Sequence, residues 1–90
     1  MSQRTVIIAS SVGLHARPAA LFVQAATATG LPVEISRVGE EPVDARSILG
    51  VMALGAKCGE EVLLTADGDG ADAALEELVA LLSRDLDAEE

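Results

Sequence analysis

The sequence predicts an α+β fold of two layers, in which helices cover one face of an antiparallel sheet and leave the other face open to water. Short segments of β-branched or alternating residues and longer segments with helical spacing follow one another in the order β-α-β-β-α-β-α. Each predicted helix has an apolar stripe, and such stripes need a sheet face to pack on. The 90 residues suffice for one modest core. We therefore expect a single domain over residues 1–90, with residues 87–90 as a frayed acidic tail.

The first strand and the first helix are expected over residues 5–9 and 16–29. Residues 5–9 are rich in β-branched side chains, which favour strands. From residue 16 onward, apolar side chains recur at spacings of three and four, which lines one face of a helix for burial. Gly30 ends this helix, because glycine is the usual residue just beyond a helix C-terminus. The buried face is predicted to consist of Ala19, Phe22, Val23 and Ala26.

The other strands are expected over residues 33–36, 43–45 and 61–66. The first and the last of these alternate apolar and polar side chains, which is typical of a strand with one buried face. Pro42 precedes the middle strand and has no N–H for a sheet ladder. This strand is therefore predicted to lie at an edge of the sheet.

Two further helices are expected over residues 48–54 and 71–84. The Ser47 hydroxyl caps the first of them, and Gly55 closes it. Apolar residues go nearly all the way round this helix, which is more than burial against one sheet requires, so some of them should lie exposed as a contact patch. The candidates for this patch are Ile48, Leu49 and Met52. The last helix is predicted to bury a stripe of Ala74, Leu75, Leu78, Leu81 and Leu82.

The excess of acidic residues indicates which classes of partner this chain can bind. Six basic residues against fifteen acidic ones give a formal net charge of −9. Nucleic acids and anionic membranes attract clustered Lys and Arg, so this balance argues against both as partners. Cys58 is the lone cysteine, which excludes an internal disulfide and fits a reducing cytosol. We expect a cytoplasmic protein whose partners are proteins or small molecules.

The candidate catalytic residues lie in the segment over residues 13–19. His15 is the only histidine and stands two residues before Arg17 and three before Pro18, a residue that suits the first turn of a helix. The helix cap is either Arg17, because a residue before proline favours extended geometry, or His15. In both cases His15 lies beside open backbone N–H groups, which favour an anion and disfavour a protonated imidazole.

This arrangement predicts a nucleophile beside a cradle for phosphate. A neutral imidazole keeps a nitrogen lone pair, and Arg17 offers a fixed fork of donors that matches phosphate oxygens. The alternative is that His15 is a polar capping residue and Arg17 a solvated charge. A single histidine and a single cysteine cannot build a structural zinc site, so we expect no metal and no cofactor.

Two other functions depend on different residues. A phosphate on Ser47 would meet the favourable end of a helix dipole and would act on partners, and Arg46 could pair with that phosphate or face water. These features favour a regulatory binding module that works through Ser47 and the apolar patch. The other hypothesis is a small thiol or acyl-group enzyme, in which Cys58 and His15 serve as nucleophile and base.

Two motifs carry a family resemblance. Residues 13–19, which read GLHARPA, and residues 46–55, which read RSILGVMALG, resemble the HPr family, the phosphocarriers of the bacterial phosphoenolpyruvate:sugar phosphotransferase system. The resemblance implies an open-faced sandwich, a four-stranded antiparallel sheet under three helices. It implies that His15 accepts a phosphoryl group on Nδ1 from phosphorylated Enzyme I and passes it to sugar-specific EIIA domains. Arg17 is similar to the family arginine that attends this group.

The resemblance also implies roles for the second motif. Ser47 is similar to the position that a regulatory serine kinase modifies, which weakens phosphorylation of the histidine and permits binding to a catabolite repressor. The residues that would dock Enzyme I and EIIA are Ile48, Leu49 and Met52. Because no second acid or base lies near His15 in the sequence, we expect a co-substrate rather than a free-standing enzyme. A monomer suits a shuttle that uses one face for successive partners.

Overall fold

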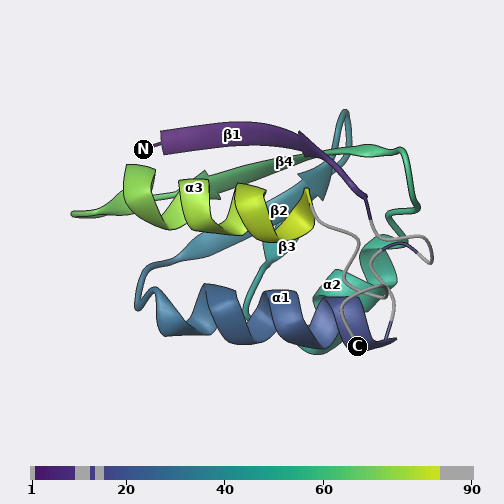
Figure 1. Cartoon of the computed structure of the whole chain (residues 1–90), viewed down its shortest axis with the longest axis horizontal. Helices are drawn as coiled ribbons and strands as arrows, with labels where there is room; N and C mark the ends of the chain where they lie inside the picture. Colours follow the sequence, from purple (N-terminus) through teal and green to yellow (C-terminus); the bar gives the residue numbers. More distant parts are fainter. Residues whose placement is uncertain (1, 10–12, 14–15, 84–90) are drawn as a thin grey trace.

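The computed structural model describes residues 2–9, 13 and 16–83 of the chain. Its elements follow the predicted order β-α-β-β-α-β-α (Figure 1). Their bounds are β1 (Ser2–Ile7), α1 (Ala16–Ala28), β2 (Val33–Arg37), β3 (Val43–Asp44), α2 (Ile48–Leu54), β4 (Glu61–Ala66) and α3 (Ala71–Leu82). Over the described residues, no helix is long and apolar enough to cross a membrane.

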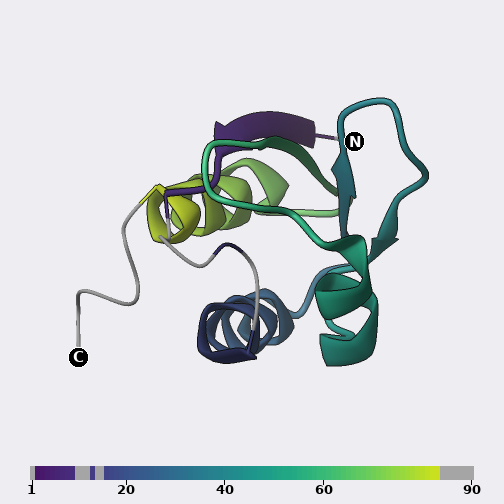
Figure 2. The same cartoon turned by 90° about the vertical axis from the view of Figure 1, so that its right-hand side faces the viewer.

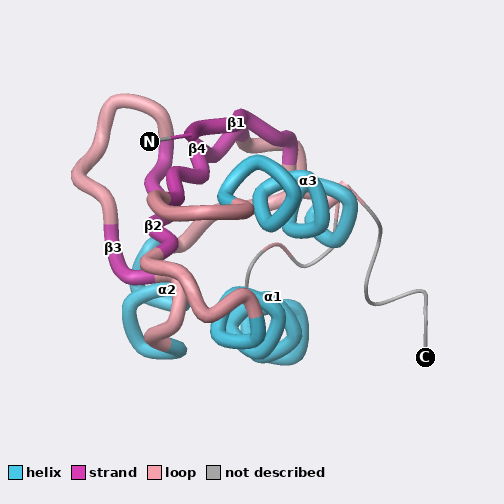
Figure 3. Tube along the Cα trace, turned by 90° about the vertical axis from the view of Figure 1, so that its left-hand side faces the viewer, coloured by secondary structure: helices cyan, strands magenta, loops and turns pink. Residues whose placement is uncertain are grey.

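The strands form one antiparallel sheet in the order β1-β4-β2-β3. Along β4, Val62, Leu64 and Ala66 are buried, whereas Glu61 is exposed and Thr65 only half-buried. This alternation shows that one face of the sheet is covered and the other is open. Figures 2 and 3 show the helices gathered on the covered side. The predicted α+β sandwich is confirmed, and β3 lies at the sheet edge, as the adjacent Pro42 predicts.

The first strand begins three residues earlier and ends two residues earlier than the sequence predicts. It begins at Ser2, which pairs with Ala66 of β4. Residues 2–4 are polar, so their local pattern does not indicate a strand, but β4 offers them a ladder. Arg4 also joins the strand to α3, because its Nε donates to Oε2 of Glu76 at 2.9 Å. Ala9 leaves the ladder, and its N–H donates to the carbonyl of Leu82 at 3.1 Å.

The core is aliphatic around a single aromatic ring. Phe22 is fully buried between the sheet and the helices. The two small residues on the same helix face, Ala19 and Ala26, are fully buried as well. Val23, predicted to be buried, is only partly so and packs at the margin of the core. The α3 stripe is confirmed for Ala74, Leu75, Leu78 and Leu82, whereas Leu81 is only partly buried and Ala71 joins the buried set.

The helix ends show why the predicted bounds differ by a residue or two. In α1 the last helical residue is Ala28, and the Thr29 hydroxyl turns back to donate to the Ala26 carbonyl at 2.7 Å. Gly30 follows with φ 71°, as expected of a residue beyond a helix end. In α3 the helix ends at Leu82 with Ser83 as cap. The predicted end at residue 84 and the predicted acidic tail over residues 87–90 lie outside the described residues.

Candidate functional site

The N-terminus of α1 carries Arg17 in its first turn. The helix begins at Ala16, so Arg17 is its second residue and the buried Pro18 its third. Arg17 is therefore not the cap, which corrects one of the two predicted alternatives. Burial of the Pro18 ring against the core outweighs the preference of a residue before proline for extended geometry. The other alternative, His15 as cap, falls on a residue outside the described ones.

Gly13 lies directly against the turn that follows α2. Its φ is 76°, and a Cβ atom there would lie 2.6 Å from the carbonyl oxygen of Ala56 and 2.8 Å from Cα of Lys57. Such distances are well inside van der Waals contact, so only glycine fits. Gly13 is thus held against the turn that follows α2.

The capping of α2 is as predicted. Ser47 has extended backbone geometry, and its Oγ accepts a hydrogen bond from the backbone N–H of Gly50 at 3.1 Å. At the other end Gly55 has φ 69°, and its N–H donates to the Met52 carbonyl at 3.2 Å. Figures 2 and 3 show α2 beside α1. The two sequence motifs, separated along the chain, therefore meet in space.

One side of α2 exposes apolar side chains to solvent. Val51 and Leu54 point into the core, which accounts for two of the apolar residues of this helix. The side chains on the other side have exposed fractions of 38% for Ile48, 78% for Leu49 and 36% for Met52. The structure thus places the predicted patch residues at the surface, with Leu49 the most accessible of them.

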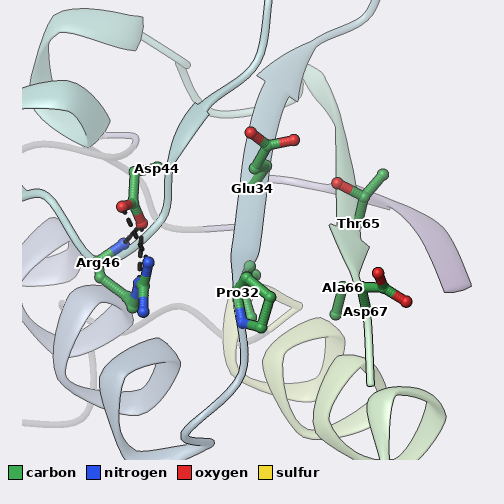
Figure 4. Close-up of a pocket in the computed structure, with 8 residues that line it drawn as sticks. Pro32, Glu34, Asp44, Arg46, Thr65, Ala66 and Asp67 are labelled. Atoms are coloured by element: carbon green, nitrogen blue, oxygen red, sulfur yellow. Dashed lines mark hydrogen bonds and ion pairs between the residues drawn. The ribbon is translucent and has the colours of Figure 1, made fainter. Parts of the chain in front are cut away.

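Arg46 binds Asp44, a residue that sequence reasoning missed. Its Nε lies 3.1 Å from Oδ1 and its Nη2 3.3 Å from Oδ2 of Asp44, and its backbone N–H donates to Oδ1 at 2.8 Å (Figure 4). The hydrogen bond from the Arg46 side chain, and then that from its backbone N–H, lower the pKa of Asp44. The spacing Asp-x-Arg before a helix cap was the available signal for this pair.

The Asp44–Arg46 pair borders a cavity of about 280 Å³ at the sheet end where β2 begins and β4 ends. Pro32 belongs to its wall and follows the C-terminal end of α1, so the cavity lies away from Arg17 at the helix N-terminus. The other residues that line it are Val33, Glu34, Thr65, Ala66 and Asp67 (Figure 4). We do not assign this cavity to the candidate site.

The thiol hypothesis and the metal prediction concern other side chains. Cys58 is exposed in the turn between α2 and β4. Its proposed partner His15 lies outside the described residues. Within the part of the chain that the structure describes, no three His, Cys, Asp or Glu side chains are grouped so that they could hold a metal ion.

Comparison with known proteins shows the family to which the chain belongs. The sequence profile of the family described as "PTS HPr component phosphorylation site" matches residues 2–84. The chain belongs to the HPr family. This family comprises the phosphocarriers of the bacterial phosphotransferase system, and its match covers both motifs.

Individual HPr proteins are similar over nearly the whole chain. Phosphocarrier protein HPr of Streptomyces coelicolor is 51% identical over 87 residues, which cover 97% of this chain and 94% of that protein. HPr-like protein Crh of Bacillus subtilis is 41% identical over 86 residues, 96% of this chain and 100% of Crh. The crystal structure of HPr from Thermoanaerobacter tengcongensis superimposes with a TM-score of 0.85 at 41% identity and covers 91% of each chain.

Proposed function

We propose that this HPr-family chain is a phosphoryl shuttle, in which His15 accepts a phosphoryl group from phosphorylated Enzyme I and transfers it to EIIA domains. The observation that supports the proposal most directly is the position of Arg17. Its exposed guanidinium belongs to the first turn of α1 and follows the only histidine by two residues. An arginine fork is suited to binding the oxygens of a phosphoryl group.

The N-terminus of α1 adds a second source of positive potential. A helix of 13 residues has a partial positive charge and unpaired N–H groups at its first turn. The first turn reads Ala-Arg-Pro-Ala, so no carboxylate of its own competes with a bound anion. Each such contribution amounts to about 0.3–1 kcal/mol at an exposed position. The phosphoryl group would be oriented there and still be released to the next acceptor.

The transfer itself exchanges one phosphorus–nitrogen bond for another. The bond to the histidine of Enzyme I breaks as the lone pair of Nδ1 of His15 forms a bond to the same phosphorus, through an in-line, charge-spread transition state. In the second transfer, a nucleophile of EIIA attacks the same phosphorus, and the bond from phosphorus to Nδ1 of His15 breaks. Because His15 is the only histidine of the sequence, the second imidazole must come from the partner. We therefore propose a co-substrate role, not a free-standing enzyme.

The exposed side of α2 is the proposed docking surface for both partners. Apolar side chains rarely remain exposed together without a binding role, and a docked partner would cover them. Helix α2 lies beside α1 (Figure 2), and Gly13 approaches the turn that follows α2, which supports a common surface for docking and transfer. Its residues are Ile48, Leu49 and Met52. We further propose that the carrier works as a cytoplasmic monomer, which leaves this surface open to successive partners.

The experiment incubates the chain with phosphoenolpyruvate and Enzyme I and measures acid-labile phosphate on the protein. We expect one phosphate per chain, none in His15→Ala, and a slower reaction in Arg17→Ala. Arg17→Lys keeps the charge but not the fork and should be intermediate. Cys58→Ser should react as wild type, which separates this function from the thiol hypothesis. Incorporation that survives in His15→Ala would refute the proposal.

Regulation through Ser47 is a second candidate function, supported by the position of its hydroxyl. Ser47 is exposed, and its Oγ already accepts the N–H of Gly50, so a phosphate oxygen could take the same place. The added charge would lie directly beside Ile48 and Leu49 of the proposed docking surface. We propose that a serine kinase modifies Ser47 and that a catabolite repressor binds the product. Titrating the repressor with modified and unmodified protein tests this, and equal affinities would contradict it.

A further inference from the structure

The carboxylate of Glu60 connects two segments that are far apart in sequence. Its Oε1 accepts the backbone N–H of Lys57 at 2.7 Å, and its Oε2 accepts a hydrogen bond from Nη2 of Arg37, also at 2.7 Å. The Arg37 and Glu60 side chains are only 34% and 32% exposed. Arg37 is the last residue of β2, so one side chain ties the turn between α2 and β4 to the end of the sheet.

Backbone hydrogen bonds hold the same turn from its other side. The N–H of Ile8, just after β1, donates to the carbonyl of Glu60 at 2.9 Å. The N–H of Gly59 donates in return to the carbonyl of Ile8 at 2.8 Å, and the N–H of Glu60 donates to the carbonyl of Lys57 at 2.9 Å. The turn is thus hydrogen-bonded both to the residue that follows β1 and, through the Glu60 side chain, to the end of β2.

Gly13 lies against the same turn. A Cβ atom at position 13 would lie 2.8 Å from Cα of Lys57, so the Lys57 backbone leaves no room for a side chain at position 13. A shift of the Lys57 backbone would therefore change the space that Gly13 occupies. Only two residues separate Gly13 from Ala16, the first residue of α1. The segment that contains His15 is short, and its starting point depends on this turn.

We propose that Glu60 is a positioning residue for phosphoryl transfer at His15. Through the backbone of Lys57 it sets the place of Gly13, and so the start of the segment that leads to Arg17. The inference rests on the proposed carrier function. It assigns Glu60 no contact with the phosphoryl group and no part in docking, since the exposed side of α2 is a different surface.

The test compares three variants as co-substrates of Enzyme I. Glu60→Ala removes both hydrogen bonds, and because a misplacement of about 1 Å can cost up to about 100-fold in rate, we expect kcat to fall about tenfold. KM for the carrier should change less than about twofold, because the docking residues are untouched. Glu60→Gln keeps an acceptor for the Lys57 N–H and should recover most of kcat. Glu61→Ala, the matched control, removes an exposed carboxylate one residue away and should behave as wild type.

A second measurement, the NMR chemical shift of the Gly13 amide, reports on the position of Gly13 independently of phosphoryl transfer. The amide resonance of Gly13 should move in Glu60→Ala, return toward its wild-type shift in Glu60→Gln and stay unchanged in Glu61→Ala. An unchanged Gly13 resonance, an unchanged kcat, or an equal fall in kcat in Glu61→Ala would overturn the inference. A wild-type chain that takes no phosphate would refute the carrier function and with it the role of Glu60 in transfer, whereas the Gly13 resonance would show separately whether Glu60 sets the position of Gly13.

Discussion

The carbonyl oxygen of Ala56 lies so close to Gly13 that it leaves no room for a side chain at position 13. The distance from that oxygen to a Cβ atom would be 2.6 Å. This close approach joins Gly13, three residues before α1, to the turn that follows α2. Its disruption should affect both stability and function.

Gly13→Ala should therefore destabilise the protein by about 2–4 kcal/mol, from about 1 kcal/mol for the positive φ and about 1–3 kcal/mol for the overlap. Gly30→Ala is the matched control, because Gly30 has φ 71° and no atom within 4 Å of a Cβ, and so should cost only the backbone part. Urea denaturation measures both free energies of unfolding. Equal losses in the two variants would show that the contact with Ala56 is relaxed without cost.

Ser47→Ala should lower the free energy of unfolding by about 0.5–2 kcal/mol, because the Gly50 N–H loses its acceptor at the start of α2. Ser47→Asp keeps a side-chain oxygen at the cap and should retain wild-type stability. The same variant places a negative charge beside the proposed docking surface, and its KM with Enzyme I should rise. A destabilised Ser47→Asp variant would contradict the capping argument.

Leu49→Ser should weaken binding to Enzyme I about tenfold while leaving stability within about 0.5 kcal/mol, because this side chain is already 78% exposed. Val38→Ser changes another exposed apolar residue, 60% exposed and outside α2, and should bind as wild type. Calorimetric titration of Enzyme I with each variant provides the affinities. Equal weakening by both substitutions would argue against a docking surface on α2.

Arg46→Gln should raise the pKa of Asp44 toward the ordinary value for aspartate, since the Arg46 side chain is the main cause of its lowering. The pair stabilises the fold fully above the unfolded-state pKa of about 3.9, and its contribution disappears as the pH falls through the lower folded-state pKa. Wild type and variant should thus converge in stability in acid. Carboxyl NMR titration measures the shift, with Asp72 as internal control because the Ser2 side chain is the main cause of its lowered pKa. A shift of Asp72 equal to that of Asp44 would contradict the local explanation.

Local chemistry made much of the fold predictable. Ser47 and Gly55 mark the two ends of α2 because a hydroxyl cap and a residue at positive φ are requirements within one helical turn. The alternation along β4 and the apolar spacing along α1 are likewise visible within a few residues. The same holds for the candidate site, whose histidine, arginine and proline lie within four consecutive positions.

Contacts between distant residues decided the rest. Arg4 and Glu76 are 72 positions apart, and their ion pair accompanies a strand that polar residues 2–4 did not indicate. Arg37 and Glu60 are 23 positions apart, so no local pattern pointed to the side chain that ties the turn against Gly13 to the sheet. Arg17 became helical before a proline because the ring of Pro18 is buried in the core. Sequence patterns report the preferences of neighbouring residues, whereas these features depend on which surfaces meet once the sheet and helices have packed.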